Sequence, residues 1–204
     1  MPNLNQPPIV LASASVSRAS ILKNAGVKFQ TIPSDCDEDS IKNKMRADGA
    51  TTEEVAERLA MAKAKMVAAD HPDHFIIGAD QMLACDGVWY DKPSDIDAAR
   101  NHLKSLCGKT HQLVSATVIL LGKECVWRYS DTSNLTMREF SDDFIEYYLS
   151  QAGEKVCRSV GAYQLEGLGA QLFSAVEGDY FSILGLPLLP IMTFLRANKL
   201  LIDG

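Results

Sequence analysis

One acidic residue and a lysine that follows it are the side chains in this sequence best placed to do chemistry. Residues 75–80 read Phe-Ile-Ile-Gly-Ala-Asp, which predicts a buried strand that ends in the Asp80 carboxylate. Ligands of α/β sheets usually bind at the carboxyl ends of strands, so Asp80 could hold a metal or act as a base. Lys92, in the pair Lys92-Pro93, suggests a negatively charged ligand. Asp80 could instead cap the following turn.

A second candidate site is the serine-rich segment 13–18, Ser-Ala-Ser-Val-Ser-Arg, between a predicted strand and a predicted helix. Small hydroxyl residues there leave backbone N–H groups exposed, and these groups and the helix dipole suit a phosphate. Arg18 could add a bidentate clamp. The same pattern also fits a helix cap formed by Ser13, Ser15 or Ser17, with Arg18 on the surface.

Three further features could contribute to a site. Lys63 lies near the apolar stripe of a predicted helix, which indicates either a charged ligand or a side chain that extends to solvent. Residues 35–39 carry four carboxylates that suit Mg²⁺, although a solvated acidic loop is the usual explanation of such a run. Glu166 lies between glycines in segment 161–167, which permits close approach of a flat ligand or a tight strand bend.

Alternating strands and helices must position these side chains. We predict strands at 8–12, 28–33, 75–80, 112–121 and 125–137, and a hairpin around Asp86-Gly87. Helices are predicted after Arg18, from Thr51 or Thr52, from Ser94 or Asp95, and at 141–151 and 188–200. The apolar stripe of the second helix is expected at Val55, Leu59, Ala62 and Met66. This order predicts an α/β sheet covered by helices on both faces.

Composition narrows the class of protein. The 204 residues can form one domain, or two lobes that share a sheet. A net charge of −6 disfavours binding to nucleic acid or to an anionic membrane. The N-terminus lacks the features of a signal peptide, and prolines and a glycine interrupt the longest apolar stretch. Five cysteines without CxxC spacing indicate free thiols in a reducing cytoplasm, and scattered histidines argue against zinc.

The motifs, taken in order, resemble the Maf family of nucleoside triphosphate pyrophosphatases. The resemblance runs from about residue 9 to residue 196, and it is specific because the whole ordered set is present. The matching motifs are Leu11-Ala-Ser-Ala-Ser-x-x-Arg18, Asp37-Glu38, Leu59-Ala-x-x-Lys63-Ala64, Gly78-Ala-Asp80, Lys92-Pro93, Leu106-x-Gly-x-x-His111, Gly161-Ala-Tyr-x-x-Glu-Gly167 and Gly185-Leu-Pro187.

The resemblance implies a fold, a reaction and a set of roles. It implies one domain over residues 1–204, with two lobes in a mixed sheet flanked by helices, similar to the inosine triphosphate pyrophosphatases, and an active cleft between the lobes. It also implies a possible homodimer and release of nucleoside monophosphate and pyrophosphate from a triphosphate with Mg²⁺ or Mn²⁺. Asp80 matches the proton acceptor, and Glu38 with Asp80 the metal ligands. The residues matched to substrate binding are Ser13, Ser15, Arg18, Lys63, Gln81, Lys92 and Glu166.

The departures from the family pattern concern base recognition. Val16 and Ser17 replace the usual proline and arginine, so a phosphate or base contact is expected to be missing. Gln81 and Glu166 resemble the branch that acts on 7-methyl-GTP more than the branch that acts on dTTP and UTP. The alternative function is a nucleotide-binding regulator of cell division or septum formation with little turnover. The sequence leaves the preferred base and the oligomeric state open.

Overall fold

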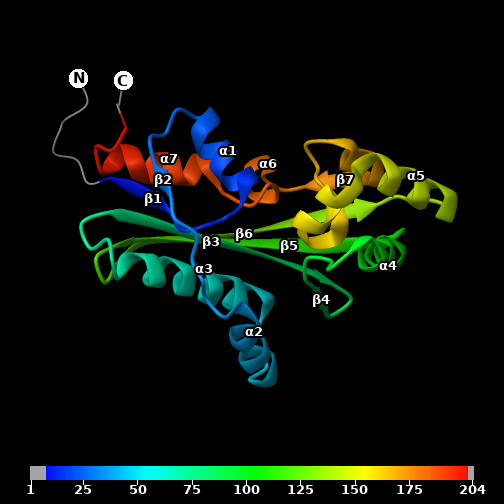
Figure 1. Ribbon diagram of the computed structural model, residues 1–204, viewed down its shortest axis with the longest axis horizontal. Coiled ribbons are helices and arrows are strands. Elements are labelled where there is room, and N and C mark those ends of the chain that lie inside the picture. The colour runs from blue at the N-terminus through cyan, green and yellow to red at the C-terminus, as the bar shows by residue number, and fades with distance from the viewer. Residues whose placement is uncertain (1–7, 202–204) are drawn as a thin grey trace. The chain divides into compact units, whose positions relative to one another are not determined.

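The computed structural model describes residues 8–201, in which seven strands form one mixed, open sheet flanked by helices (Figure 1). The strand order is β2-β1-β3-β5-β6-β7, and β4 pairs with β3. The predicted α/β fold class is confirmed. The strands are β1 (Ile9–Leu11), β2 (Gln30–Thr31), β3 (Phe75–Cys85), β4 (Val88–Tyr90), β5 (Thr110–Leu121), β6 (Glu124–Met137) and β7 (Phe173–Glu177).

Helices and short 3₁₀ turns connect these strands. The helices are α1 (Val16–Asn24), α2 (Glu38–Ala47), α3 (Thr52–Ala68), α4 (Ile96–Leu106), α5 (Asp142–Ala152), α6 (Tyr180–Ile183) and α7 (Leu188–Ala197). The 3₁₀ turns are η1 (Gly153–Arg158), η2 (Val160–Ala162) and η3 (Leu168–Leu172). No helix within residues 8–201 is both long enough and apolar enough to span a membrane.

Helix starts follow the predicted caps closely. Thr51 and Glu54 form a reciprocal capping box at the start of α3, because each side chain bonds the backbone N–H of the other residue. Asp95 and Ser141 cap α4 and α5 in the same local way, by accepting a bond from the N–H three residues later. The predicted hairpin is also confirmed, since Asp86 and Gly87 both adopt positive φ between β3 and β4.

Three details of the predicted elements were wrong. Helix α2 was not predicted, because none of its residues is buried and its only large apolar side chains are Ile41 and Met45. Strand β3 does not end at Asp80 but continues to Cys85, because residues 83–85 pair with β4. On α3 the buried face includes Val55 and Leu59 but not Ala62 or Met66, and Met66 is exposed.

The described chain divides into two compact units that share strands β3, β5 and β6. The first comprises residues 8–81, 115–131 and 185–201, and the second comprises residues 82–114 and 132–184. In the first unit, α1 and α7 lie over one face of the strands and α3 lies over the other (Figure 1). Strand β1 pairs in parallel with both β2 and β3, so residues 9–11 are held inside the sheet.

The second unit has its own apolar core, to which strands β3, β5 and β6 contribute Leu83, Leu113 and Leu135. Helix α4 packs there with α5 and with the turns η1 and η2. A buried polar contact crosses this core, where His111 Nε2 lies 2.6 Å from the Tyr163 hydroxyl oxygen. Burial lowers the pKa of His111 to about 4, so the ring is neutral at neutral pH. Tyr163 is thereby anchored at the start of the segment that carries Glu166.

Candidate active site

Asp80 lies within strand β3, and its side chain is buried. The position differs from the predicted strand end, because the strand continues through Gln81 towards β4. A carboxylate inside a sheet must be paired, since burial of an unpaired charge is strongly unfavourable. The structure provides this partner from helix α3, so the alternative in which Asp80 only caps a turn is wrong.

Close packing between α3 and β3 brings the partner within reach. Gly78 faces Ala60 and Ala64, and a Cβ atom placed on Gly78 would lie 2.3 Å from Ala60 O and 2.7 Å from Ala64 Cβ. The small residues on both elements therefore let the helix approach the strand more closely than side chains would allow. This approach places Lys63 beside Asp80.

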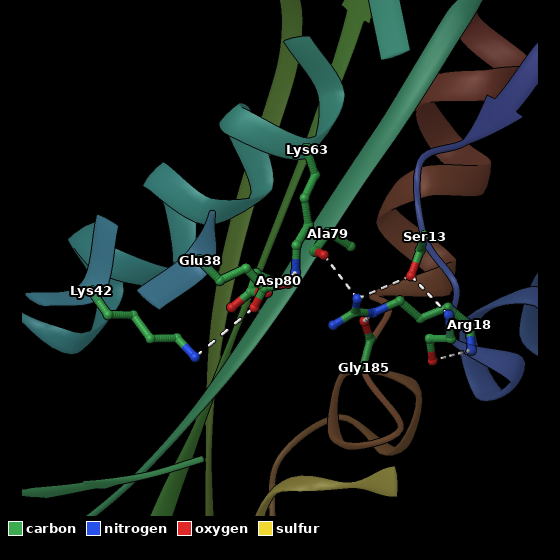
Figure 2. A network of polar contacts seen from close by, with 9 residues as sticks. Ser13, Arg18, Glu38, Lys42, Lys63, Ala79, Asp80 and Gly185 are labelled. Carbon is green, nitrogen blue, oxygen red and sulfur yellow. Dashed lines mark hydrogen bonds and ion pairs between the residues drawn. The ribbon is translucent and has the colours of Figure 1, made fainter. Parts of the chain in front are cut away.

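Lys63 contacts both carboxylates of the candidate site, Asp80 and Glu38 (Figure 2). Its ammonium nitrogen lies 2.5 Å from Asp80 Oδ1 and 2.8 Å from Glu38 Oε1. The residue is only 8% exposed, so the side chain does not extend along the helix into solvent. Lysine is rarely buried unless it is paired, and here one ammonium bridges two carboxylates. The structure thus joins three of the residues that the family resemblance implied.

Glu38 reaches this pair from the first turn of α2, the helix that the sequence did not reveal. Asp37 caps α2 by accepting a bond from Ser40 N, which sets the direction in which Glu38 projects. Glu38 also lies 3.9 Å from Lys42, one turn further along the same helix. Its side chain is 40% exposed, so one edge of the site is open to solvent. Lys42 was not a predicted site residue; its spacing of four from Glu38 is the signal that could have identified it.

Arg18 ties three segments of the first unit together (Figure 2). Its Nε donates to Gly185 O at 2.8 Å, and its Nη1 donates to Ala79 O at 2.8 Å and to Ser13 Oγ at 3.3 Å. Arg18 is therefore only partly exposed, and its guanidinium is bonded within the protein. Burial lowers the pKa of Arg18, while the charges of Asp80 and Glu38 act in the opposite direction. The side chain holds the backbone immediately before Asp80.

Ser13 and Ser15, in the segment between β1 and α1, form hydrogen bonds with Arg18. Ser15 is the cap of α1 and accepts a bond from Arg18 N at 3.3 Å. Ser13 is buried, and its hydroxyl accepts both from Ser15 N at 3.1 Å and from Arg18 Nη1. The capping interpretation is thus confirmed for Ser15. A role of Ser13 and Ser15 in substrate binding stays a prediction.

Gln81, the residue after Asp80, donates from Nε2 to Ser115 Oγ at 2.9 Å. Ser115 is a buried polar residue of β5 that sequence reasoning did not select. Its only signal was a hydroxyl within the mainly apolar run of residues 113–121. This bond orients the side chain that differs between the two branches of the resembled family.

The remaining two predicted site residues belong to the second unit. Lys92 is exposed immediately before the buried Pro93, and Glu166 is exposed in a turn. Gly161 and Ala162 both adopt positive φ just before Tyr163, so this segment is a sharp turn rather than a bent strand. The proposed contacts of Lys92 and Glu166 with substrate stay predictions.

Two other groups of residues do not join the site. A cavity of about 530 Å³ is lined by α2, α3, β5 and β6, but it contains none of the predicted site residues. Of the carboxylates in segment 35–39, Glu38 forms an ion pair with Lys63, and Asp37 is used as a helix cap. Among residues 8–201, no group of three or more His, Cys, Asp or Glu side chains is arranged so that it could hold a metal ion.

We expect Arg18→Lys to reduce the kcat of the triphosphate hydrolysis that the family resemblance implies by about 10–100-fold. The KM should change less, and the melting temperature should fall. Lysine keeps the charge but has one donor nitrogen, so it cannot bond Ala79 O and Gly185 O as the guanidinium does. Steady-state kinetics and thermal unfolding test this result, with Arg58→Lys, at an exposed position of α3, as the matched control. A variant with unchanged kcat and a raised KM would instead identify Arg18 as a simple phosphate-binding charge.

Comparison with known proteins places this combination of fold and site in a defined class. A family model described as "Maf-like protein" matches residues 8–198, and the chain belongs to this family. The chain is 52% identical over 189 residues to a nucleoside triphosphate pyrophosphatase of Paramagnetospirillum magneticum, covering 93% of this chain and 97% of that protein. It is 47% identical over 191 residues to a 7-methyl-GTP pyrophosphatase of Rhizobium meliloti, covering 94% and 96%. The family resemblance seen in the motifs is confirmed.

Proposed function

We propose that this chain hydrolyses nucleoside triphosphates between the α- and β-phosphates, releasing a nucleoside monophosphate and pyrophosphate. The observation that carries the proposal is the buried contact of Lys63 with both Asp80 and Glu38. A base, a cation and a second carboxylate meet there beside an arginine. The names of relatives that are about half identical to this chain support the same reaction.

Each residue of the constellation has a part in this reaction. Lys63 donates to Oδ1 of Asp80, and the second oxygen, Oδ2, accepts the proton of the water that attacks the α-phosphorus. As the new P–O bond forms, the α–β bridging bond breaks and its electron pair leaves with pyrophosphate. Lys63, together with Lys92, stabilises the charge that develops on the leaving group. Arg18 keeps the backbone of Ala79, and therefore Asp80, in place.

A divalent cation fits the chemistry of the two carboxylates. Asp80 and Glu38 offer hard oxygen donors, and they already share one cationic group, the Lys63 ammonium. Mg²⁺ commonly uses one or two carboxylates and completes its shell with water and substrate phosphates. When bound, Mg²⁺ or Mn²⁺ would neutralise phosphate charge and make coordinated water more acidic. We propose Glu38 and Asp80 as its ligands.

The reaction is tested by measuring pyrophosphate release from a panel of canonical and modified triphosphates. We expect release with Mg²⁺ or Mn²⁺, loss of activity in EDTA, and recovery when either metal is added back, because the proposed ligands are carboxylate oxygens. Full activity after rigorous chelation would remove the metal from the mechanism. A protein that binds triphosphates but leaves them intact would instead be the nucleotide-binding regulator of cell division.

For base preference, we propose guanine-type or modified purine triphosphates over dTTP and UTP. An ionised Glu166 only accepts hydrogen bonds, which suits the N1–H and N2–H₂ edge of guanine and the positive ring of 7-methylguanine. A glutamine at position 166 would offer a hydrogen-bond donor as well as an acceptor. The name of the relative from Rhizobium meliloti, 7-methyl-GTP pyrophosphatase, supports the same preference. A wrong base would leave the Glu166 carboxylate without its hydrogen-bond donors, and such losses make hydrogen-bonding sites selective.

We expect Glu166→Gln to reduce the preference for 7-methyl-GTP over dTTP by about tenfold, because the glutamine amide can both accept and donate hydrogen bonds to a base. The ratio of kcat/KM values for the two substrates measures the effect. Glu154→Gln, at another exposed carboxylate of the second unit, is the control. Equal turnover of both substrates by the wild type, unchanged in Glu166→Gln, would show that Glu166 does not read the base.

We also propose that the protein acts in the cytoplasm as a homodimer, as the family resemblance implies. The five cysteines are free thiols in the structure, which suits a reducing compartment. Light scattering on the purified protein would measure the oligomeric state directly.

A further inference from the structure

The proposed metal ligands are held by a positive charge of the protein itself. Lys63 contacts Oδ1 of Asp80 and Oε1 of Glu38, and both Lys63 and Asp80 are almost fully buried. Figure 2 shows the three side chains converging from α3, β3 and α2 on one point. The ammonium thus lies between the oxygens that would have to bind a divalent ion.

Lys63 and a divalent ion cannot both bind Asp80 Oδ1 and Glu38 Oε1 at contact distance. Charge-assisted hydrogen bonds at these distances are strong, and a second cation would be repelled by the buried ammonium. Lys42 increases this repulsion, because it lies 3.9 Å from the other oxygen of Glu38. The two carboxylates are therefore neutralised before any metal arrives, and they are poor ligands for a metal ion alone.

A triphosphate changes this balance. Its phosphate oxygens offer Lys63 an alternative anionic partner, and the lysine side chain has a flexible four-carbon stem that allows the ammonium to move. We propose that Lys63 competes with the divalent metal for Glu38 and Asp80, and gives up these carboxylates when a triphosphate binds. Metal and triphosphate then strengthen each other's binding, and the enzyme does not hold the metal tightly without substrate. This inference rests on the metal site of the proposed function.

The test is Mn²⁺ binding to the protein without nucleotide, measured by the electron paramagnetic resonance signal of free Mn²⁺. We expect Lys63→Met to bind Mn²⁺ about tenfold more tightly than wild type or better, because the competing charge is removed. Lys65→Met is the matched control, since it removes one exposed positive charge from the same helix. The added affinity should disappear in the double variant Lys63→Met/Asp80→Asn.

A second variant and a check of folding distinguish the possible outcomes. Lys63→Gln serves as a second variant in case Lys63→Met does not fold, which circular dichroism and thermal unfolding establish. If neither variant binds Mn²⁺ more tightly than wild type, while Asp80→Asn weakens binding, the metal site stands and the competition is refuted. If no variant shows Asp80-dependent binding, the competition and the proposed metal site both fail. Pyrophosphate release by the wild type decides the hydrolytic function separately.

Discussion

Asp80→Asn is expected to reduce pyrophosphate release by about 10²–10⁴-fold while the protein stays folded. Asparagine has nearly the same shape as aspartate, so the packing of β3 against α3 is kept. The amide oxygen still accepts a bond from Lys63, but the variant has neither the basicity nor the charge to accept a proton or hold a metal. The kcat measured at saturating substrate and metal reports this loss.

The folded state of Asp80→Asn must be established at the same time. Weakening a hydrogen bond between charged groups lowers the free energy of unfolding by about 1–3 kcal/mol, which leaves a protein of ordinary stability folded. Asp73→Asn, at an exposed position just before β3, is the matched control and should keep wild-type kcat. Half of the wild-type rate in a well-folded Asp80→Asn variant would exclude Asp80 as the base.

Gly78→Ala should impair both stability and catalysis, although the side chain it adds is a single methyl group. The new Cβ would meet Ala60 O at 2.3 Å and Ala64 Cβ at 2.7 Å, which is closer than such atoms can approach. Because one contact is with helix backbone, the conflict is relieved only if α3 moves away from β3. Overpacking of this kind typically costs about 1–3 kcal/mol.

The shift of α3 would also separate Lys63 from Asp80, so we expect a fall of about tenfold or more in kcat, as small displacements of catalytic groups are costly. Differential scanning calorimetry and pyrophosphate release measure the two effects on one sample. In the control Gly167→Ala, the nearest atom to the new Cβ is 3.9 Å away, so its stability should be close to that of wild type. An unchanged melting temperature for Gly78→Ala would show that α3 and β3 do not pack as described.

Local sequence signals were sufficient to predict helix caps and turns, because these are formed by residues that are close along the chain. The capping box of Thr51 and Glu54 and the Asp86-Gly87 turn involve residues only a few positions apart, so their chemistry can be read directly. Helix α2 was missed because it buries no residue, and its two large apolar side chains, Ile41 and Met45, are too few to reveal the periodicity on which helix prediction depends. The end of β3 was misplaced because its last residues are fixed by pairing with β4.

The sequence by itself determined the family, the α/β class and the identity of the acidic and basic residues that could act on a phosphate. The ordered motifs carry that information independently of any distance. Only the tertiary structure decided that Lys63 is buried between Asp80 and Glu38, because the three residues come from separate elements. It also decided that Arg18 bonds backbone carbonyls at Ala79 and Gly185, the latter 167 positions away in the chain. Contacts of this kind depend on how closely α3, β3 and the loop before α7 pack, and residue type alone does not specify that packing.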